Sequence, residues 1–122
     1  MKFLLDANFM LLPGKFRVDI FTELGKFGKP ELFTLDLVIS ELEKISRLRS
    51  EDARAARLGL KLVKEHGVKI LKAEKEKADD ELARLSAEGY AICTQDAELI
   101  KRIRSKGNHI IRLRQKKYLE RI

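Results

Sequence analysis

Hydrophobic and polar residues occur along this chain in two alternating kinds of segment. Short apolar runs are typical of strands buried on both faces of a parallel sheet, and we expect such strands at residues 3–5, 31–35, 68–71, 90–94 and 109–113. Between them, apolar residues recur at helical spacing, which predicts helices over residues 16–24, 37–48, 50–66, 78–88 and 97–106. Alternating strands and helices predict a single three-layer α/β/α domain over residues 1–122, with a central parallel sheet of about five strands.

Local signals mark the ends of these segments. Asp36 and Ser50 are suited to cap helix N-termini, and Pro13-Gly14 indicates a break in the chain. Three expected helices end at a glycine that is soon followed by a strand: Gly67, Gly89 and Gly107.

The composition excludes several classes of protein. Of 122 residues, 44% are hydrophobic and 37% are charged, which is too apolar for a disordered chain and too charged for a membrane protein. No apolar run approaches the roughly 20 residues that span a bilayer, and the first residues do not resemble a secretory signal. The single cysteine, Cys93, excludes an intramolecular disulfide and a Cys-rich zinc site. We therefore expect a soluble, cytoplasmic protein.

The net charge of +7 is confined to one end of the sequence. Residues 1–96 contain 17 basic and 17 acidic side chains, whereas residues 97–122 contain 9 basic and 2 acidic ones. This predicts a basic C-terminal tail at about residues 114–122 and favours a polyanionic partner.

Acidic residues follow two of the predicted strands. Asp6 follows the first strand, and Thr94 and Asp96 follow the fourth. Ligands of open α/β sheets bind beyond the carboxyl ends of the strands, so these residues are candidates for a site. A turn or capping role is the alternative for Asp6.

Two further acidic positions lie on predicted helices. Glu41 shares a helical face with Leu37 and Ile45, and burial of an acid on such a face requires a partner or a cation. Asp79 and Asp80 begin a helix, where acids also stabilise the helix dipole. A solvated or salt-bridged side chain is the alternative for Glu41.

Three or four carboxylates at one edge would repel one another unless cations compensated their charge. Hard oxygen ligands suit Mg²⁺ or Mn²⁺, and carboxylate-held ions of this kind activate water for attack on a phosphodiester. This chemistry agrees with an anionic substrate held by basic residues.

In these segments the sequence resembles the PIN-domain nucleases. The resemblance covers nearly the whole chain and rests on LLDANFML (4–11), VISELEKI (38–45), KADDELARLSAEGYAICTQDAELIKRI (77–103) and HIIRL (109–113). The N-terminal part is most similar to PIN nucleases that process ribosomal RNA in the small-subunit processome. The VapBC-type toxin ribonucleases are a second similar group, and the sequence does not separate the two roles.

The resemblance implies a role for each matching residue. Catalytic and metal-binding roles fall on Asp6, Glu41, Asp79 and Asp96, and Asp80 and Glu98 are additional candidate ligands. Asn8 and Thr94 match the positions that support these acids. The basic residues expected to hold RNA are Arg102, Arg104, Lys106, Arg112, Arg114, Lys116 and Lys117.

The predicted function is therefore that of a Mg²⁺- or Mn²⁺-dependent ribonuclease, in rRNA or other RNA processing or as a toxin-type endoribonuclease. The resemblance also implies single-stranded or structured RNA as substrate, a homodimer, and an antitoxin or ribosome-assembly partner. The alternative is a non-catalytic RNA-binding or assembly factor with the same fold.

Overall fold

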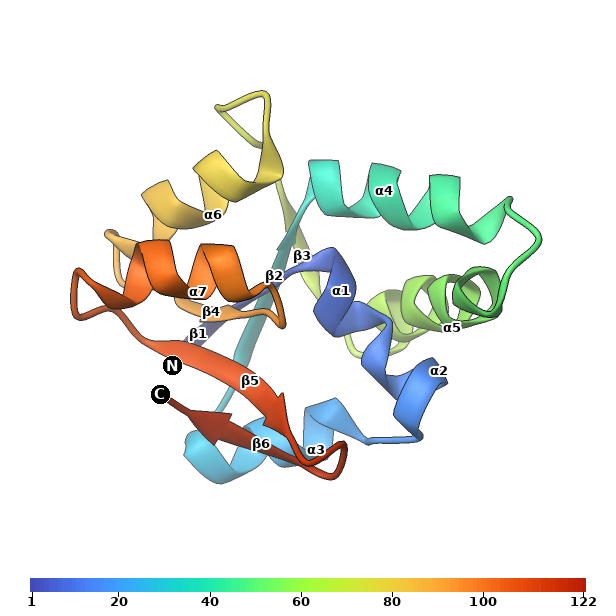
Figure 1. The fold of residues 1–122 in the computed structure, drawn as a ribbon, viewed down its shortest axis with the longest axis horizontal. Helices are drawn as coiled ribbons and strands as arrows, with labels where there is room; N and C mark the ends of the chain where they lie inside the picture. Colours follow the sequence, from blue (N-terminus) through green and yellow to red (C-terminus); the bar gives the residue numbers. More distant parts are fainter.

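The computed structural model describes residues 1–122 and contains one six-stranded sheet (Figure 1). Its strands are β1 (Lys2–Leu5), β2 (Glu31–Leu35), β3 (Lys69–Leu71), β4 (Ala91–Cys93), β5 (Ile110–Arg114) and β6 (Tyr118–Arg121). They are arranged in the order β3-β2-β1-β4-β5-β6, and every neighbouring pair is parallel except β5 and β6. The five expected parallel strands are confirmed.

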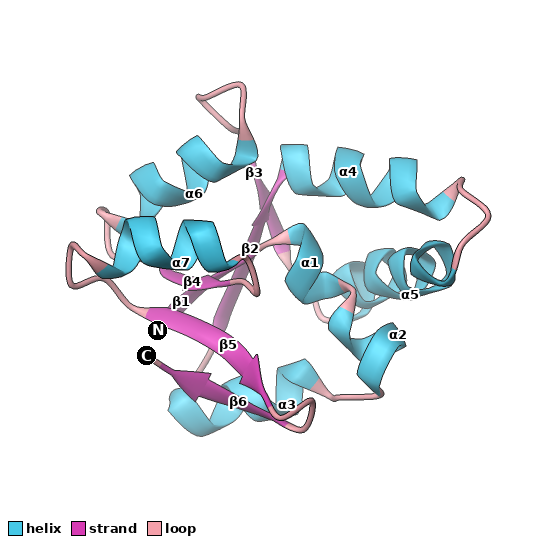
Figure 2. Ribbon diagram, in the orientation of Figure 1, coloured by secondary structure: helices cyan, strands magenta, loops and turns pink.

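Helices cover both faces of this sheet (Figure 2). They are α1 (Ala7–Met10), α2 (Leu12–Phe16), α3 (Ile20–Leu24), the 3₁₀ helix η1 (Gly25–Phe27), α4 (Asp36–Ser46), α5 (Glu51–Glu65), α6 (Ala78–Ser86) and α7 (Ala97–Arg104). Helix α6 packs against α7, while α5 packs against α2 and α4, which lie on the other side in Figure 1. The predicted three-layer α/β/α architecture is confirmed.

The strand order creates a switch point between β1 and β4. From β1 the chain moves outward through β2 to β3, and from β4 it moves in the opposite direction to β5. In doubly wound sheets, ligands bind beyond the carboxyl ends of the strands at such a point. The residues that leave β1 and β4 therefore lie where a site is expected.

The segment between β1 and β2 differs from its prediction. Pro13 and Gly14 do not break the chain but lie inside α2, where proline is tolerated in the first turn. The helix expected over residues 16–24 is interrupted by Arg17, which has a left-handed backbone and ends α2. Helix α5 approaches this segment closely, since a Cβ on Gly59 would lie 2.7 Å from the Met10 carbonyl oxygen.

The basic C-terminal residues take part in the sheet. After β5, a tight turn at residues 115–117 reverses the chain, and β6 pairs antiparallel with β5. The Leu119 side chain is only 1% exposed and belongs to the hydrophobic core. Residues 118–121 thus form the edge strand of the sheet.

The core contains most of the apolar N-terminal residues. Phe9, Met10, Leu12 and Phe21 are buried, which confirms a core role for them. Cys93 is fully buried on β4, and its lack of solvation raises the pKa of the thiol well above the usual value. None of the helices has the length and apolar character required to cross a membrane.

Candidate active site

The residues that follow β1 and β4 form one hydrogen-bonded group. Thr94 is fully buried, and its hydroxyl donates to Asp6 Oδ2 at 2.7 Å and accepts from the Asp96 N–H at 3.1 Å. Asn8 Oδ1 lies 3.3 Å from the same hydroxyl and accepts from the Gln95 N–H at 3.0 Å. A single threonine therefore connects the two strand-end aspartates, and Asn8 fixes the loop that carries Thr94 and Asp96.

The environment of Asp6 disfavours the charged form of its carboxyl group. Its side chain is 6% exposed, and Oδ1 accepts a hydrogen bond from the Ala7 N–H at 2.8 Å. The pKa of Asp6 is raised from its usual 3.8 to about 6, chiefly by loss of hydration on burial and to a smaller extent by the negative charges of Glu41 and Asp79. The bonds from Thr94 and Ala7 act in the opposite direction but do not compensate. Glu41 and Asp79 act on this pKa through repulsion between like charges.

Asp96 combines two functions at the start of α7. Its Oδ1 accepts from the N–H groups of Glu98 and Leu99, so the aspartate caps the helix, while Oδ2 has no hydrogen-bond partner. Glu98 is exposed in the first turn of the same helix. One oxygen of Asp96 is therefore available to a ligand.

Glu41 is a solvated side chain, which was one of the two alternatives for it. The face that Glu41 shares with Leu37 and Ile45 is not the buried face of α4, because Val38 and Leu42 fill the core and Glu41 is exposed. Glu41 therefore needs no partner to offset burial. What distinguishes it is its electrostatic effect on Asp6.

Asp79 and Asp80 have different environments at the start of α6. Asp80 forms an ion pair with Arg102 at 2.8 Å, and this guanidinium holds the pKa of Asp80 below its usual value. Asp79 is exposed, forms no ion pair, and acts on the pKa of Asp6. Asp80 is therefore engaged by Arg102, whereas Asp79 has no basic partner.

The four acids with predicted metal roles share the absence of any basic partner. None of Asp6, Glu41, Asp79 and Asp96 forms an ion pair, although ten ion pairs occur elsewhere in the structure. No group of three or more acidic, histidine or cysteine side chains stands close enough to hold a metal ion as the structure is arranged. The donor set nevertheless fits a hard divalent cation, because it consists of carboxylate oxygens whose negative charge nothing else compensates.

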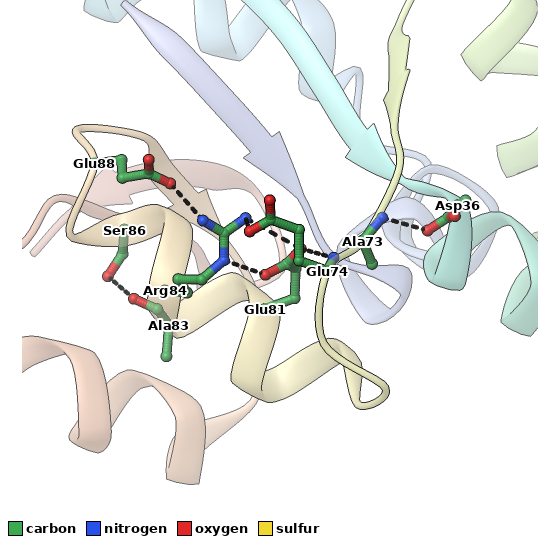
Figure 3. Close-up of polar contacts among 8 residues, drawn as sticks. All are labelled: Asp36, Ala73, Glu74, Glu81, Ala83, Arg84, Ser86 and Glu88. Carbon is green, nitrogen blue, oxygen red and sulfur yellow. Dashed lines mark hydrogen bonds and ion pairs between the residues drawn. The ribbon is translucent and has the colours of Figure 1, made fainter.

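A buried glutamate that sequence reasoning missed holds the start of α6 in place (Figure 3). The Glu81 side chain is fully buried and accepts from the Glu74 N–H and from Arg84 Nε at 2.6 Å. Asp36, the first residue of α4, accepts from the Ala73 N–H at 3.0 Å. Side chains from two helices thus bind consecutive amides of the loop after β3, which leads directly to Asp79.

A second residue missed by sequence reasoning is Gln95, between Thr94 and Asp96. Its side-chain amide accepts from the Leu113 N–H at 2.5 Å and donates to the Leu113 carbonyl at 3.4 Å. The side-chain amide bonds both backbone groups of Leu113, as a neighbouring strand would. It therefore continues the hydrogen bonding between β4 and β5 beyond the end of β4. The site loop is thereby attached to β5.

The basic residues expected to hold RNA fall into three groups. Arg104, Arg112 and Arg114 line one groove of about 670 Å³ between α7, β5 and β6, together with Gln95 and Lys101. Lys116 and Lys117 lie in the turn between β5 and β6.

The other two predicted RNA-binding residues lie apart from that groove. Arg102 is paired with Asp80. Lys106 follows the C-terminus of α7, at the opposite end of that helix from Asp96. Arg112 and Arg114, although they line the groove, both contact Glu120.

The fold and site define a doubly wound α/β domain with uncompensated acids at its switch point. A family model of the PIN-like domain matches residues 3–116, so the chain belongs to the PIN-like domain family. No curated protein matches the sequence significantly.

Two solved structures have the same fold. The PIN domain endonuclease Utp24 is 25% identical, with a TM-score of 0.80, over 99% of this chain and 92% of that chain. A domain of a functionally unknown protein from Methanocaldococcus jannaschii DSM 2661 is 18% identical, with a TM-score of 0.64, over 93% and 91% of the two chains. The chain is therefore similar to a known endonuclease along almost its full length.

Proposed function

We propose that this protein is a divalent-metal-dependent ribonuclease that hydrolyses RNA phosphodiester bonds. The observation that carries the proposal is the pair of acids at the switch point, buried Asp6 and Asp96, which the Thr94 hydroxyl connects and which have no basic partner. Membership of the PIN-like family and similarity to an endonuclease support internal cleavage of the strand.

In the mechanism that we propose, the metal ion, Mg²⁺ or Mn²⁺, would be held by four acids: Asp6, Glu41, Asp79 and Asp96. The bound metal would lower the pKa of the attacking water and neutralise charge on the phosphate. Thr94 orients Asp6 by donating to Oδ2, and Asn8 holds the loop that presents Asp96. Arg104, Arg112 and Arg114 hold the RNA backbone in the adjoining groove.

The first test is cleavage of an end-labelled RNA with Mn²⁺, with Mg²⁺ and with EDTA. We expect internal cleavage with metal and none with EDTA. Asp6→Asn and Asp96→Asn should each reduce the rate by at least about hundredfold, because either change removes a charge that holds the ion.

Two controls make this test specific. Glu43→Gln changes an exposed acid on the same helix as Glu41 and should leave the rate within about twofold of wild type, since its partner is Arg47. Full activity in both aspartate variants would refute the proposed site. Binding of RNA without cleavage in any metal would instead support the alternative, a non-catalytic RNA-binding or assembly factor.

The biological setting is a separate part of the proposal. The similarity to the N-terminal sequences of rRNA-processing PIN nucleases favours RNA processing with a ribosome-assembly partner, and a toxin-type role with an antitoxin is the second candidate. A homodimer is proposed from the family resemblance alone. Light scattering at high protein concentration tests the dimer, and a monomer would refute it.

A further inference from the structure

Basic residues from distant parts of the sequence gather around the turn between β5 and β6. On the side facing α3, Arg17, Lys116 and Lys117 line a groove of about 350 Å³. A second groove of about 690 Å³ shares Phe16 and Arg17 with it and is lined by Lys15, Arg54 and Arg57. We call these two grooves the α2 grooves.

Several of these cations have no acidic partner. Arg17, Arg54, Lys116 and Lys117 form no ion pair, and Lys116 Nζ lies 5.5 Å from the ring centroid of Phe16. The acids that line the first α2 groove are already engaged. Asp19 caps α3 through the Thr22 N–H, and Glu23 pairs with Lys26 and accepts from the Leu119 N–H. The second α2 groove contains one acid, Glu51, against four basic residues, so the α2 grooves together present net positive charge to solvent.

The backbone at these positions is strained. Arg17, Gln115 and Lys116 are the three non-glycine residues with positive φ, at 55°, 53° and 57°. Glycine or asparagine would adopt these conformations more easily, and strained positions of this kind occur where a side chain is needed for function. In this protein all three line the grooves around the turn.

The α2 grooves continue the surface that begins at the candidate active site. The groove between α7, β5 and β6 is lined by Gln95, the neighbour of Thr94 and Asp96, and it extends to Gln115. Lys116, the next residue, lines the first α2 groove, and Arg17 lines both α2 grooves. Positive charge therefore runs from the site over the turn to α2 and α5.

We propose that the α2 grooves, centred on Arg17 and Lys116, bind the phosphate backbone of an RNA strand that extends beyond the cleavage site over the β5–β6 turn. This inference rests on the proposed ribonuclease function and adds a second binding surface to it. Its ligand is a polyanion with regularly spaced charges, because single basic side chains along a continuous surface match successive phosphates. Phe16 beneath Lys116 provides an aromatic surface beside them.

The test uses glycine to remove charge and relieve strain together. In Arg17→Gly/Lys116→Gly, each glycine fits the left-handed backbone, so the melting temperature should equal or exceed that of wild type. Binding of single-stranded RNAs of about 5 and about 20 nucleotides is measured in EDTA, which prevents metal-dependent cleavage. The control, Lys29→Gln/Lys61→Gln, removes the same charge at exposed positions outside the grooves.

We expect wild type and control to bind the long RNA more tightly than the short one. The glycine variant should lose roughly tenfold in affinity for the long RNA and little for the short one, and its salt slope should fall by about 0.7 for each lost phosphate contact. Arg17→Asn/Lys116→Asn should behave in the same way, which keeps the test valid if the glycine variant folds poorly.

Two results would overturn the inference. In the first, the glycine variant and wild type would gain the same factor in affinity when the RNA is lengthened from about 5 to about 20 nucleotides. That result would show that the α2 grooves do not contact the strand. If wild type still cleaved RNA with Mn²⁺ in that case, the proposed ribonuclease function would stand and only the second surface would be lost. Absence of RNA binding by wild type at both lengths would refute the second surface, and absence of cleavage with Mn²⁺ and with Mg²⁺ as well would refute both proposals.

Discussion

The pKa of Asp6 links the candidate site to the stability of the fold. Its value of about 6 in the folded protein lies above the 3.8 of an exposed aspartate. Well below pH 3.8 the carboxyl group is protonated in both the folded and the unfolded state, so it does not lower the free energy of unfolding. Between these two values the unfolded chain ionises first, so stability falls as the pH rises. Above pH 6 the full cost applies, about 3 kcal/mol, because each pKa unit corresponds to about 1.4 kcal/mol.

Asp6→Asn should therefore stabilise the protein at neutral pH while it removes activity. The amide is uncharged, and its oxygen can still accept from the Ala7 N–H. The Thr94 hydroxyl, which now donates to Asp6 Oδ2, can donate to Asn8 Oδ1 at 3.3 Å instead and accept from the new amide. We expect a free energy of unfolding at pH 8 that is about 1–3 kcal/mol higher than that of wild type, with the difference vanishing near pH 4. Urea unfolding at both pH values, without metal, measures it. A variant that is less stable than wild type at pH 8 would contradict the pKa assigned to Asp6.

Single residues differ in how well the sequence predicts them. Asp6 and Asp96 could be found because they directly follow apolar strands, and parallel strands end at one edge. Glu81 could not, because a glutamate between Asp80 and Leu82 looks like any solvated residue of a first helical turn. Its burial depends on Glu74 and Arg84, which only the tertiary structure brings to it. The amide of Gln95 gives equally little local signal.

At the scale of elements, the loop after β3 determines where α6 begins. Glu81 binds this loop at the Glu74 N–H, and Asp36 on α4 binds it at the Ala73 N–H (Figure 3). Helix α6 carries Asp79 in its first turn. Two helices on different faces of the sheet therefore cooperate in placing one acid of the site.

Glu81→Gln should lower both stability and activity. The substitution replaces one acceptor oxygen by an amide donor and leaves a buried partner unpaired, at a cost of about 1–3 kcal/mol. Because α6 then loses its fixed start, the rate with Mn²⁺ should fall while RNA affinity in EDTA stays unchanged. Glu76→Gln, an exposed change in the same loop, is the matched control. Equal effects of the two substitutions would show that Glu81 does not position Asp79.

The sequence predicts some elements better than others. All five parallel strands contain short apolar runs, and they were placed correctly to within one residue at most ends. Strand β6 was missed for two reasons. Its sequence, YLER, is short and half charged, so it has no apolar run. The preceding turn also lacks the Asn-Gly or Gly residues that are typical of a hairpin. Helices α1 and α2 were missed because ANFMLLPGK reads as one apolar stretch that proline interrupts.

At the scale of the whole molecule, the fold brings together basic residues that lie far apart in the sequence. Residues 1–96 are neutral in sum, yet Arg17 and Arg54 from this part join Lys116 and Lys117 on one surface. The sheet brings them together because β5 carries the chain back past α2 and α3. The C-terminal segment therefore contributes to the fold as well as to the charge.

A chain shortened to residues 1–116 tests whether the C-terminal segment is part of the folded unit. The PIN-like match ends at residue 116, but Leu119 is buried and its N–H donates to Glu23 Oε1 at 2.9 Å. The shortened chain should lose at least the 2–5 kcal/mol typical of removing one buried leucine, because β5 also loses its antiparallel neighbour. Leu119→Ala in the full chain should reproduce much of this loss, whereas Lys117→Gln, which removes only a charge, should change stability by about 0.5 kcal/mol or less. Thermal and urea unfolding measure these differences. Wild-type stability in the shortened chain would show that β6 is a dispensable basic tail, as its composition alone suggests.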